Sequence, residues 1–256
     1  MSLLQTSHLV KSFGGVAAVA GVSFQLQAGE LLALIGPNGA GKSTCFNIIN
    51  GQLRPDSGTV LVDGHDVTGR SPRNVWRLGV ARTFQVSATF KSMSVRENVQ
   101  TVLLSGARRA LDPWRSATDA YRTQALSLLA GVGMAQQAER ACGLLAYGDV
   151  KRLELAMALA SEPRLLLMDE PTAGMGPQER NDMMALTARL ARERNIGVLF
   201  TEHSMDVVFA HADRVLVMAR GQLIAEGDPR SVRDDPQVQA VYLGTGAAFQ
   251  ARAALT

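Results

Sequence analysis

The residues best suited to chemistry form one short glycine-rich stretch, GPNGAGKST, at positions 36–44. It directly follows a continuous apolar run, LLALI at 31–35, and fits the spacing G-x-x-x-x-G-K-[ST]. Glycines let the backbone curl so that successive N–H groups point at phosphate oxygens. The helix expected to begin there would add its positive dipole end. The stretch therefore predicts a phosphate-binding loop, and the full match behind a strand disfavours a turn without a ligand.

Two side chains in this loop have separate expected roles. Lys42 supplies a positive charge to the β- and γ-phosphates, and Ser43 offers a hydroxyl to Mg²⁺. The predicted nucleotide contacts of the loop are Gly36, Pro37, Asn38, Gly39, Ala40, Gly41, Lys42, Ser43 and Thr44. A phosphate loop alone does not distinguish a kinase from a GTPase, a helicase or a transport ATPase.

A carboxylate pair follows a second apolar run, LLLMDEP at 165–171. Side chains at the carboxyl end of a buried parallel strand emerge where α/β sheets bind their ligands. Asp169 suits the Mg²⁺ shell, and Glu170 is then placed to orient or deprotonate an attacking water. The alternative for the pair is a solvated turn at the end of a strand.

Two further polar residues are candidates by position. Gln85, in ARTFQ, could contact Mg²⁺ and water, and His203, in LFTEHS, ends another apolar run and could hydrogen-bond a γ-phosphate. Taken alone, each residue type is more often structural than functional. The other three histidines have no such placement and are expected to be structural: His8, His65 and His211.

The pattern of apolar residues predicts an α/β fold. Alternating strands are expected at 8–10, 22–27 and 59–64, and strands buried on both faces at 31–36, 165–170, 197–202 and 214–221. Segment 178–195 has helical periodicity. Buried strands that alternate with amphipathic helices indicate a mainly parallel sheet. Residues 92–163 contain no convincing strand and are predicted to be a helical insertion, broken near Asp112-Pro113.

Composition excludes several classes of protein. With 256 residues, 46% hydrophobic and 19% charged, the chain is not expected to be disordered, collagen-like or a coiled coil. A net charge of +3, with no Lys/Arg run longer than two, argues against a nucleic-acid footprint. Cys45 and Cys142 are expected to be free thiols, and neither a signal peptide nor a membrane-spanning segment is expected. Segment 244–256 is predicted to be a frayed tail.

The motifs occur in a fixed order that resembles a known family. After GPNGAGKST come Gln85, LLAYGD at 144–149, LLLMDEP and TEH at 201–203. This order is similar to the ATP-binding cassette of ABC transporters, over residues 4–243 with 92–163 inserted. The resemblance implies a phosphate-loop ATPase core with an N-terminal antiparallel β-subdomain and an inserted α-helical subdomain. It also implies ATP and Mg²⁺ as cofactors, with Ser43, Gln85 and Asp169 around the metal and Glu170, Gln85 and His203 as catalytic groups.

The family signature L-S-G-G-Q is altered in this sequence. It reads Leu145, Ala146, Tyr147, Gly148 and Asp149. Since Ala146 has no hydroxyl, the resemblance places the ATP contact on the Gly148 backbone and on a helix start near Asp149, where aspartate is a favourable cap. Gly176 stands where the family has an aspartate, and Phe13 stands where it has an aromatic ring against adenine. The alternative for Phe13 is a core aromatic.

The form LAYG, with RTFQ and DEPTAGM, resembles branched-chain amino acid importers, and most closely the longer of their two ATPase subunits. The resemblance implies a head-to-tail dimer, of one subunit type or two, with ATP at its interface. Its partners would be transmembrane permease subunits, contacted through segment 86–98, and indirectly a solute-binding protein. No nucleic acid is expected, and the location would be peripheral, at the cytoplasmic face of the inner membrane.

Three other functions stay open at this point. They are the ATPase of an exporter, a soluble ABC ATPase that acts on nucleic acid or ribosomes, and a nucleotide sensor without turnover. A single cassette without sustained heptads argues against the second, and Glu170 argues against the third. The sequence does not name the transported solute.

Overall fold

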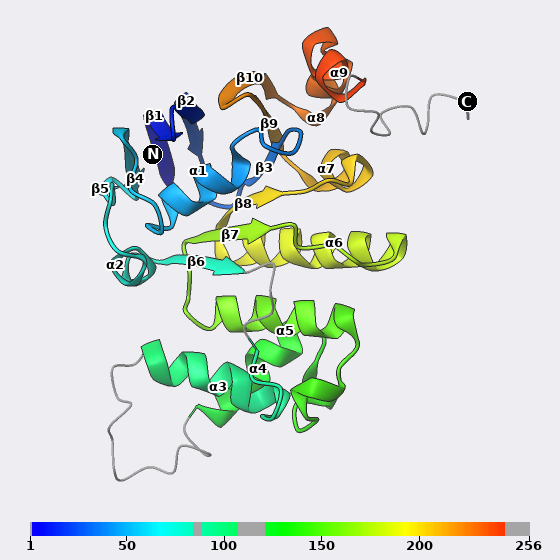
Figure 1. The fold of residues 1–256 in the computed structure, drawn as a ribbon. Helices are drawn as coiled ribbons and strands as arrows, with labels where there is room; N and C mark the ends of the chain where they lie inside the picture. Colours follow the sequence, from blue (N-terminus) through cyan, green and yellow to red (C-terminus); the bar gives the residue numbers. More distant parts are fainter. Residues whose placement is uncertain (1, 84–88, 107–120, 244–256) are drawn as a thin grey trace, which may run out of the picture.

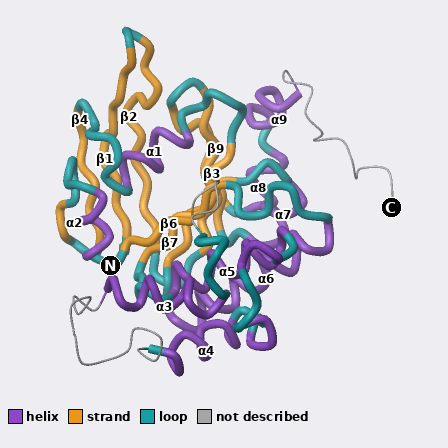
Figure 2. Tube along the Cα trace, turned by 60° about the horizontal axis from the view of Figure 1, so that its bottom comes forward, coloured by secondary structure: helices purple, strands orange, loops and turns teal. Residues whose placement is uncertain are grey.

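The fold was analysed in a computed structural model that describes residues 2–83, 89–106 and 121–243 (Figure 1). Gln85, the predicted break at Asp112-Pro113 and the predicted tail 244–256 lie outside the described residues. The described strands form two sheets, one antiparallel and one mainly parallel. Helices cover both faces of the mainly parallel sheet (Figure 2).

The antiparallel sheet is built from the N-terminal part of the chain, as predicted. Its strand order is β2-β1-β4-β5. The strands are β1 (Leu4–Phe13), β2 (Val16–Leu26), β4 (Ser57–Val62) and β5 (His65–Asp66). Gly14 and Gly15 join β1 to β2 with positive φ angles of 53° and 86°, a conformation that glycine adopts without steric cost. This hairpin places Phe13 at its tip.

The six-stranded sheet has the order β10-β9-β3-β8-β7-β6, in which only β10 runs antiparallel to its neighbour. Its strands are β3 (Leu31–Ile35), β6 (Val80–Thr83), β7 (Leu165–Asp169), β8 (Gly197–Thr201), β9 (Arg214–Ala219) and β10 (Gln222–Gly227). The four continuous apolar runs of the sequence are thus central strands. Both faces of a parallel sheet are covered by other elements, so neither face needs polar side chains.

Alternation along these strands divides the interior into two cores. One set of side chains, among them Leu32, Leu167 and Leu199, packs with helix α1 (Lys42–Ile49) and the antiparallel sheet. We call this the α1-side core. The other set, among them Leu166 and Phe200, packs with helices that include α5 (Tyr147–Leu159), α6 (Pro177–Arg194) and α7 (Met205–His211). The helix predicted at 178–195 is therefore confirmed.

Helices make up the described part of the segment predicted as an insertion. They are α3 (Val95–Gly106), α4 (Arg122–Gly131), the 3-10 turns Ala135–Gln137 and Cys142–Leu144, and α5. Figure 1 shows α3, α4 and α5 as a separate lobe below the sheet. Its described residues form no strand, only an isolated bridge between Ser94 and Ala141. The limits 92–163 and 4–243 stay predictions.

Three short helices complete the described fold: α2 (Pro72–Arg77), α8 (Pro229–Asp234) and α9 (Pro236–Leu243). Within residues 2–83, 89–106 and 121–243, no helix combines the length and apolar character needed to cross a membrane.

Replacing Phe200 by alanine tests the packing of the central strand β8. The Phe200 side chain is fully buried, so Phe200→Ala should lower the free energy of unfolding by about 3–5 kcal/mol. Urea unfolding followed by circular dichroism measures this change. Leu144→Ala is the matched control, because Leu144 is 66% exposed, and its effect should stay within about 0.5 kcal/mol. Equal effects of the two substitutions would contradict this account of the core.

Candidate functional site

The glycine-rich loop joins β3 to α1 and is wedged between neighbouring strands. A Cβ atom at Gly36 would lie 2.1 Å from the Met218 carbonyl oxygen in β9, and one at Gly41 would lie 2.2 Å from the Ala18 carbonyl oxygen in β2. Both glycines have positive φ angles, of 148° and 104°. Gly39 also has a positive φ, but a Cβ there would meet open space. The curled backbone therefore depends on glycine at two positions for close packing as well as for conformation.

Lys42 begins α1 and turns back over this loop. Its Nζ donates hydrogen bonds to the carbonyl oxygens of Gly36, at 2.7 Å, and of Pro37, at 3.1 Å. Burial lowers the pKa of the Lys42 ammonium, and the carboxylates of Glu170 and Asp169 oppose that shift. The ammonium thus lies within electrostatic reach of both predicted acids. This arrangement puts one cation at the mouth of a loop lined with backbone amides.

A buried thiol directly follows the loop. Cys45 is fully buried in α1, with its Sγ 3.8 Å from the Sδ of Met218. Burial raises the pKa of this thiol to about 12. Both Cys45 and Cys142 are free, as predicted.

Asp169 lies at the carboxyl end of β7, beside Thr201 at the end of β8. One carboxylate oxygen, Oδ1, accepts a hydrogen bond of 2.8 Å from the Thr201 hydroxyl, and Oδ2 accepts one of 3.0 Å from Arg82 in β6. The Asp169 carboxylate is therefore held from both sides by neighbouring strands. Sequence reasoning missed Arg82, because its sequence position does not show which partner it meets across the sheet.

Glu170 and His203 face each other, which the sequence did not predict. His203 Nε2 lies 2.8 Å from Glu170 Oε1, with the imidazole 51% exposed and the carboxylate side chain 24% exposed. The Glu170 backbone has a positive φ of 50°, and its amide donates to Thr201 at 3.1 Å. Non-glycine residues rarely adopt that conformation, and strain of this kind is found at functional sites. The geometry allows His203 to orient the Glu170 carboxylate.

Glu202 is a second residue that sequence reasoning missed. It is 4% exposed and accepts hydrogen bonds from the Thr172 amide at 3.0 Å and the Thr172 hydroxyl at 2.5 Å. The His203 amide also donates to it, at 3.1 Å. Glu202 therefore ties the turn after Glu170 to the strand end that carries His203. The available signal was a carboxylate directly after an apolar strand.

The signature stretch begins α5 and lies across the sheet from α1. Helix α5 packs into the opposite core from α1, and Figure 1 shows α5 in the lower lobe. One chain therefore does not bring Leu145, Ala146, Tyr147, Gly148 and Asp149 against its own phosphate loop. The expected capping role of Asp149 is wrong. Ala146 is the N-cap, the helix starts at Tyr147, and Asp149 lies in the first turn, where it accepts a hydrogen bond from Gln137 at 3.1 Å.

Phe13 is not a core aromatic. Its side chain is 48% exposed at the tip of the β1–β2 hairpin, with Lys11 Nζ 5.6 Å from the ring centroid. An exposed ring of this kind is available for stacking on a planar ligand.

The donors near the loop suit a hard cation. Asp169 offers carboxylate oxygen, and Ser43, exposed in the first turn of α1, offers a hydroxyl. Mg²⁺ prefers oxygen ligands and is usually held by one or two protein groups together with substrate phosphates. No cluster of three or more His, Cys, Asp or Glu side chains able to hold a metal occurs in the described part of the chain. Ser43 and Asp169 therefore fit Mg²⁺ bound together with a nucleotide.

Removing the ammonium of Lys42 tests the loop. Lys42→Ala should weaken nucleotide binding by about 10- to 100-fold, the loss expected for a charge-assisted hydrogen bond of about 1.5–3 kcal/mol. Titration calorimetry with MgATP measures the affinity. Lys91→Ala, which removes an exposed lysine, is the control and should bind like the parent protein. Equal affinity of the Lys42 and Lys91 variants would contradict the site.

This sequence is similar to those of known transport proteins. Residues 19–173 match the family model described as ABC transporter, and residues 222–248 match that described as branched-chain amino acid ATP-binding cassette transporter. The high-affinity branched-chain amino acid transport ATP-binding protein BraF of Pseudomonas aeruginosa is 38% identical over 94% of this chain and 98% of its own. LivG of Escherichia coli K12, which has the same description, is 37% identical over the same shares of the two chains.

Solved structures agree in fold. A nucleotide-free ATP-binding cassette from an ABC transporter has a TM-score of 0.84 and 32% identity, over 94% of this chain and 99% of that one. Another ABC transporter cassette, in its ADP conformation, has a TM-score of 0.85 and 32% identity, over 95% of this chain and 99% of that one. The likeness of sequence and fold runs through both sheets and the helical lobe, so this chain belongs to the family of ABC transporter ATP-binding proteins.

Proposed function

We propose that this chain binds MgATP at residues 36–44 and hydrolyses it to power an importer of branched-chain amino acids or a related small solute. The observation that carries the proposal is that Lys42, Asp169 and the Glu170–His203 pair meet where the parallel strands end. Glu170 is partly exposed there, which leaves its carboxylate accessible to water. A binding module without turnover would not need such a base.

Each residue has a definite task in this proposal. Lys42 and the loop amides bind the β- and γ-phosphates, while Ser43 and Asp169 hold Mg²⁺, which neutralises phosphate charge. Glu170 takes the proton of the attacking water, and His203 fixes the orientation of Glu170. Gln85, outside the described residues, is proposed as a further Mg²⁺ and water contact, and Phe13 as the surface against adenine.

A second ATPase subunit would complete the site. The signature stretch Leu145–Asp149 lies on the far side of the sheet from its own loop, so it can serve only the loop of another subunit. Backbone N–H groups at Gly148, in the first turn of α5, would meet the γ-phosphate there. Ala146 has no hydroxyl to add. This head-to-tail arrangement uses both surfaces of each subunit, in a dimer of identical or different chains.

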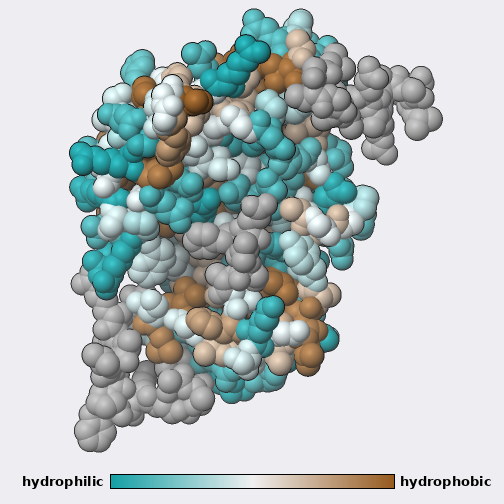
Figure 3. Space-filling model, viewed as in Figure 1, coloured by the Kyte–Doolittle hydropathy of each residue, from teal (hydrophilic) through white to brown (hydrophobic). Residues whose placement is uncertain are grey.

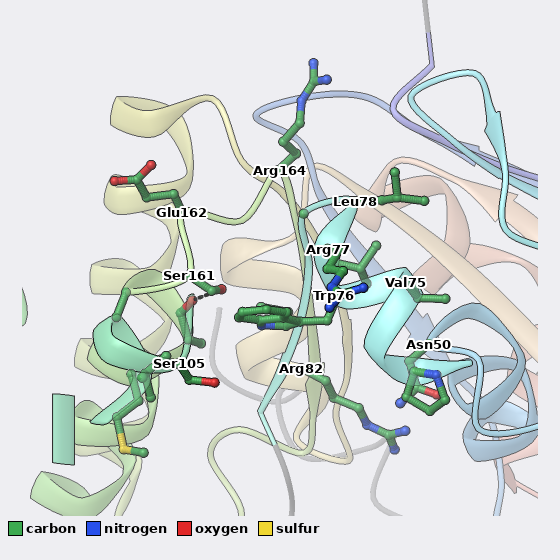
Figure 4. Close-up of a pocket in the computed structure, with 18 of the residues that line it drawn as sticks. Asn50, Val75, Trp76, Arg77, Leu78, Arg82, Ser105, Ser161, Glu162 and Arg164 are labelled. Atoms are coloured by element: carbon green, nitrogen blue, oxygen red, sulfur yellow. Dashed lines mark hydrogen bonds between the residues drawn. The ribbon is translucent and has the colours of Figure 1, made fainter. Parts of the chain in front are cut away.

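A groove beside β6 is the proposed docking site for the permease subunits. It has a volume of about 1630 Å³ and is lined from α2, β6, α3 and α5, with Trp76 and Ser105 on facing walls (Figure 4). The predicted docking segment 86–98 continues from β6, and its described part includes Phe90, which is 48% exposed. Apolar side chains also appear on the surface of the helical lobe in Figure 3.

The transported solute is proposed from the relatives. BraF and LivG are described as branched-chain amino acid transport proteins, and the chain spans nearly all of their length. The subunit would act as a peripheral protein at the cytoplasmic face of the inner membrane, and a solute-binding protein would deliver the cargo to the permease. Nucleic acid is not proposed as a partner, since the net charge is only +3.

Glu170→Gln separates hydrolysis from binding. The substitution keeps the shape of the side chain but removes the base, so turnover should fall by about 10²–10⁴. MgATP binding measured by calorimetry should persist, because the loop is unchanged. ATP-bound dimers should accumulate and be visible by size-exclusion chromatography with ATP but not with ADP. Glu193→Gln, which changes an exposed glutamate on α6, is the control. Wild-type turnover by Glu170→Gln would mean that another group activates the water.

Gly148→Asp tests the cross-subunit contact. A side chain at Gly148 would come within about 3.6 Å of Glu179 Oε1, so the variant places two carboxylates together where phosphate should bind. Dimer formation and turnover should be lost, whereas MgATP binding by the monomer should survive. Gly131→Asp, which adds the same charge near Arg194 at the end of α4, is the control. Normal turnover by Gly148→Asp would refute the proposed interface.

A further inference from the structure

The Arg82 side chain contacts several elements of the fold, and no sequence motif predicted these contacts. Its Nη2 donates to Asp169 Oδ2 at 3.0 Å, and its Nη1 donates to Asn47 Oδ1 at 2.7 Å and to Gln52 Oε1 at 3.2 Å. The guanidinium carbon also lies 5.7 Å from the centroid of the Phe46 ring. One side chain of the edge strand β6 thus joins Asp169 in β7 to α1 and the turn that follows it.

This pairing is largely withdrawn from water. The Arg82 side chain is 11% exposed and that of Asp169 is 14% exposed. A buried ion pair needs further hydrogen bonds to offset desolvation, and Asn47 and Thr201 provide them. Only a planar guanidinium can serve a carboxylate and two amide oxygens at once, which a lysine ammonium on a flexible stem does poorly. The contact is therefore specific to arginine.

Arg82 also lines the groove described above, with Trp76 and Arg77 (Figure 4). Helix α2 ends at Arg77, and only Leu78 and Gly79 separate it from β6. The amides of both residues bond back to the last turn of α2, Leu78 to Val75 and Gly79 to Trp76. A shift of β6 at Arg82 would therefore move the half-buried Trp76.

We propose that Arg82 is a positioning residue that holds Asp169 and transmits a change at that carboxylate to the groove beside β6. The inference rests on the proposed nucleotide site, because Mg²⁺ bound with a nucleotide brings positive charge to the carboxylate that Arg82 neutralises. Like charges repel, so the guanidinium is pushed away from Asp169, and this displacement carries Arg82 and β6 with it. Two separate sites joined by one mobile contact are what a coupling mechanism requires.

Tryptophan fluorescence tests this coupling in the isolated chain. The sequence has two tryptophans, so Trp114→Phe leaves Trp76 as the only tryptophan. In that background MgADP should change the Trp76 emission, and ADP with a chelator should change it much less. Adding Arg82→Gln should remove most of this emission change. MgADP should still bind by calorimetry.

Two further variants make the result decisive. Arg82→Lys keeps the positive charge but lacks the planar guanidinium with its several donors. It should therefore lose more than half of the Trp76 emission change. If melting curves show that Arg82→Gln is unfolded, the emission change of Arg82→Lys tests the inference instead. Arg192→Gln is the matched control, because it breaks an exposed Arg–Asp pair of 2.9 Å elsewhere, and its response should be unchanged.

Three outcomes have distinct meanings. A full emission change in the Arg82 variants would overturn the inference. So would a parent protein that binds MgADP by calorimetry without any change in Trp76 emission. A parent protein that does not bind MgADP would instead refute the proposed function.

Discussion

The alternation of side chains across the six-stranded sheet is the constraint on which the site depends. Every second residue of each strand faces α1, and this parity brings Arg82, Asp169 and Thr201 to one side at neighbouring strand ends. A shift of one residue in the register of β7 would turn Asp169 to the opposite core. The Asp169 carboxylate, its two hydrogen-bond donors and the glycine-rich loop are therefore fixed by the same pattern that forms the core.

This arrangement of strand ends also places acidic and basic side chains close together. Asp169 and Glu170 carry two negative charges within reach of Lys42, and Arg82 adds a second cation from the other side. Backbone amides of a curled glycine-rich loop also favour anions. Without a nucleotide, the acids and the cations stabilise one another. In the proposed function, a bound nucleotide with its metal would redistribute those pairings and so link binding to conformation at these strand ends.

Much of this arrangement could be predicted from local sequence, and the rest could not for a physical reason. The loop at 36–44, the carboxylates after LLLM and the central strands are signalled by residues adjacent in the chain. The Glu170–His203 and Arg82–Asp169 contacts join residues 33 and 87 positions apart, and only the order of strands decides them. The edge strands β6 and β10 were also missed, because short or mixed polar segments lack a continuous apolar run. Asp149 was misplaced because the N-cap of α5 is Ala146, three residues before the aspartate that the sequence suggested.

Cys45 has a consequence for how the loop can be observed. Its thiol is sealed beneath α1 against Met218, and only a thiolate reacts readily with electrophiles. A thiol reagent can therefore reach Cys45 only when α1 separates from the sheet, so its rate of labelling reports how often the phosphate loop opens. Bound nucleotide, which clamps the loop to the start of α1, would slow that reaction. Mass spectrometry of the labelled protein would therefore measure the motion of the loop at a cysteine that the chain already contains.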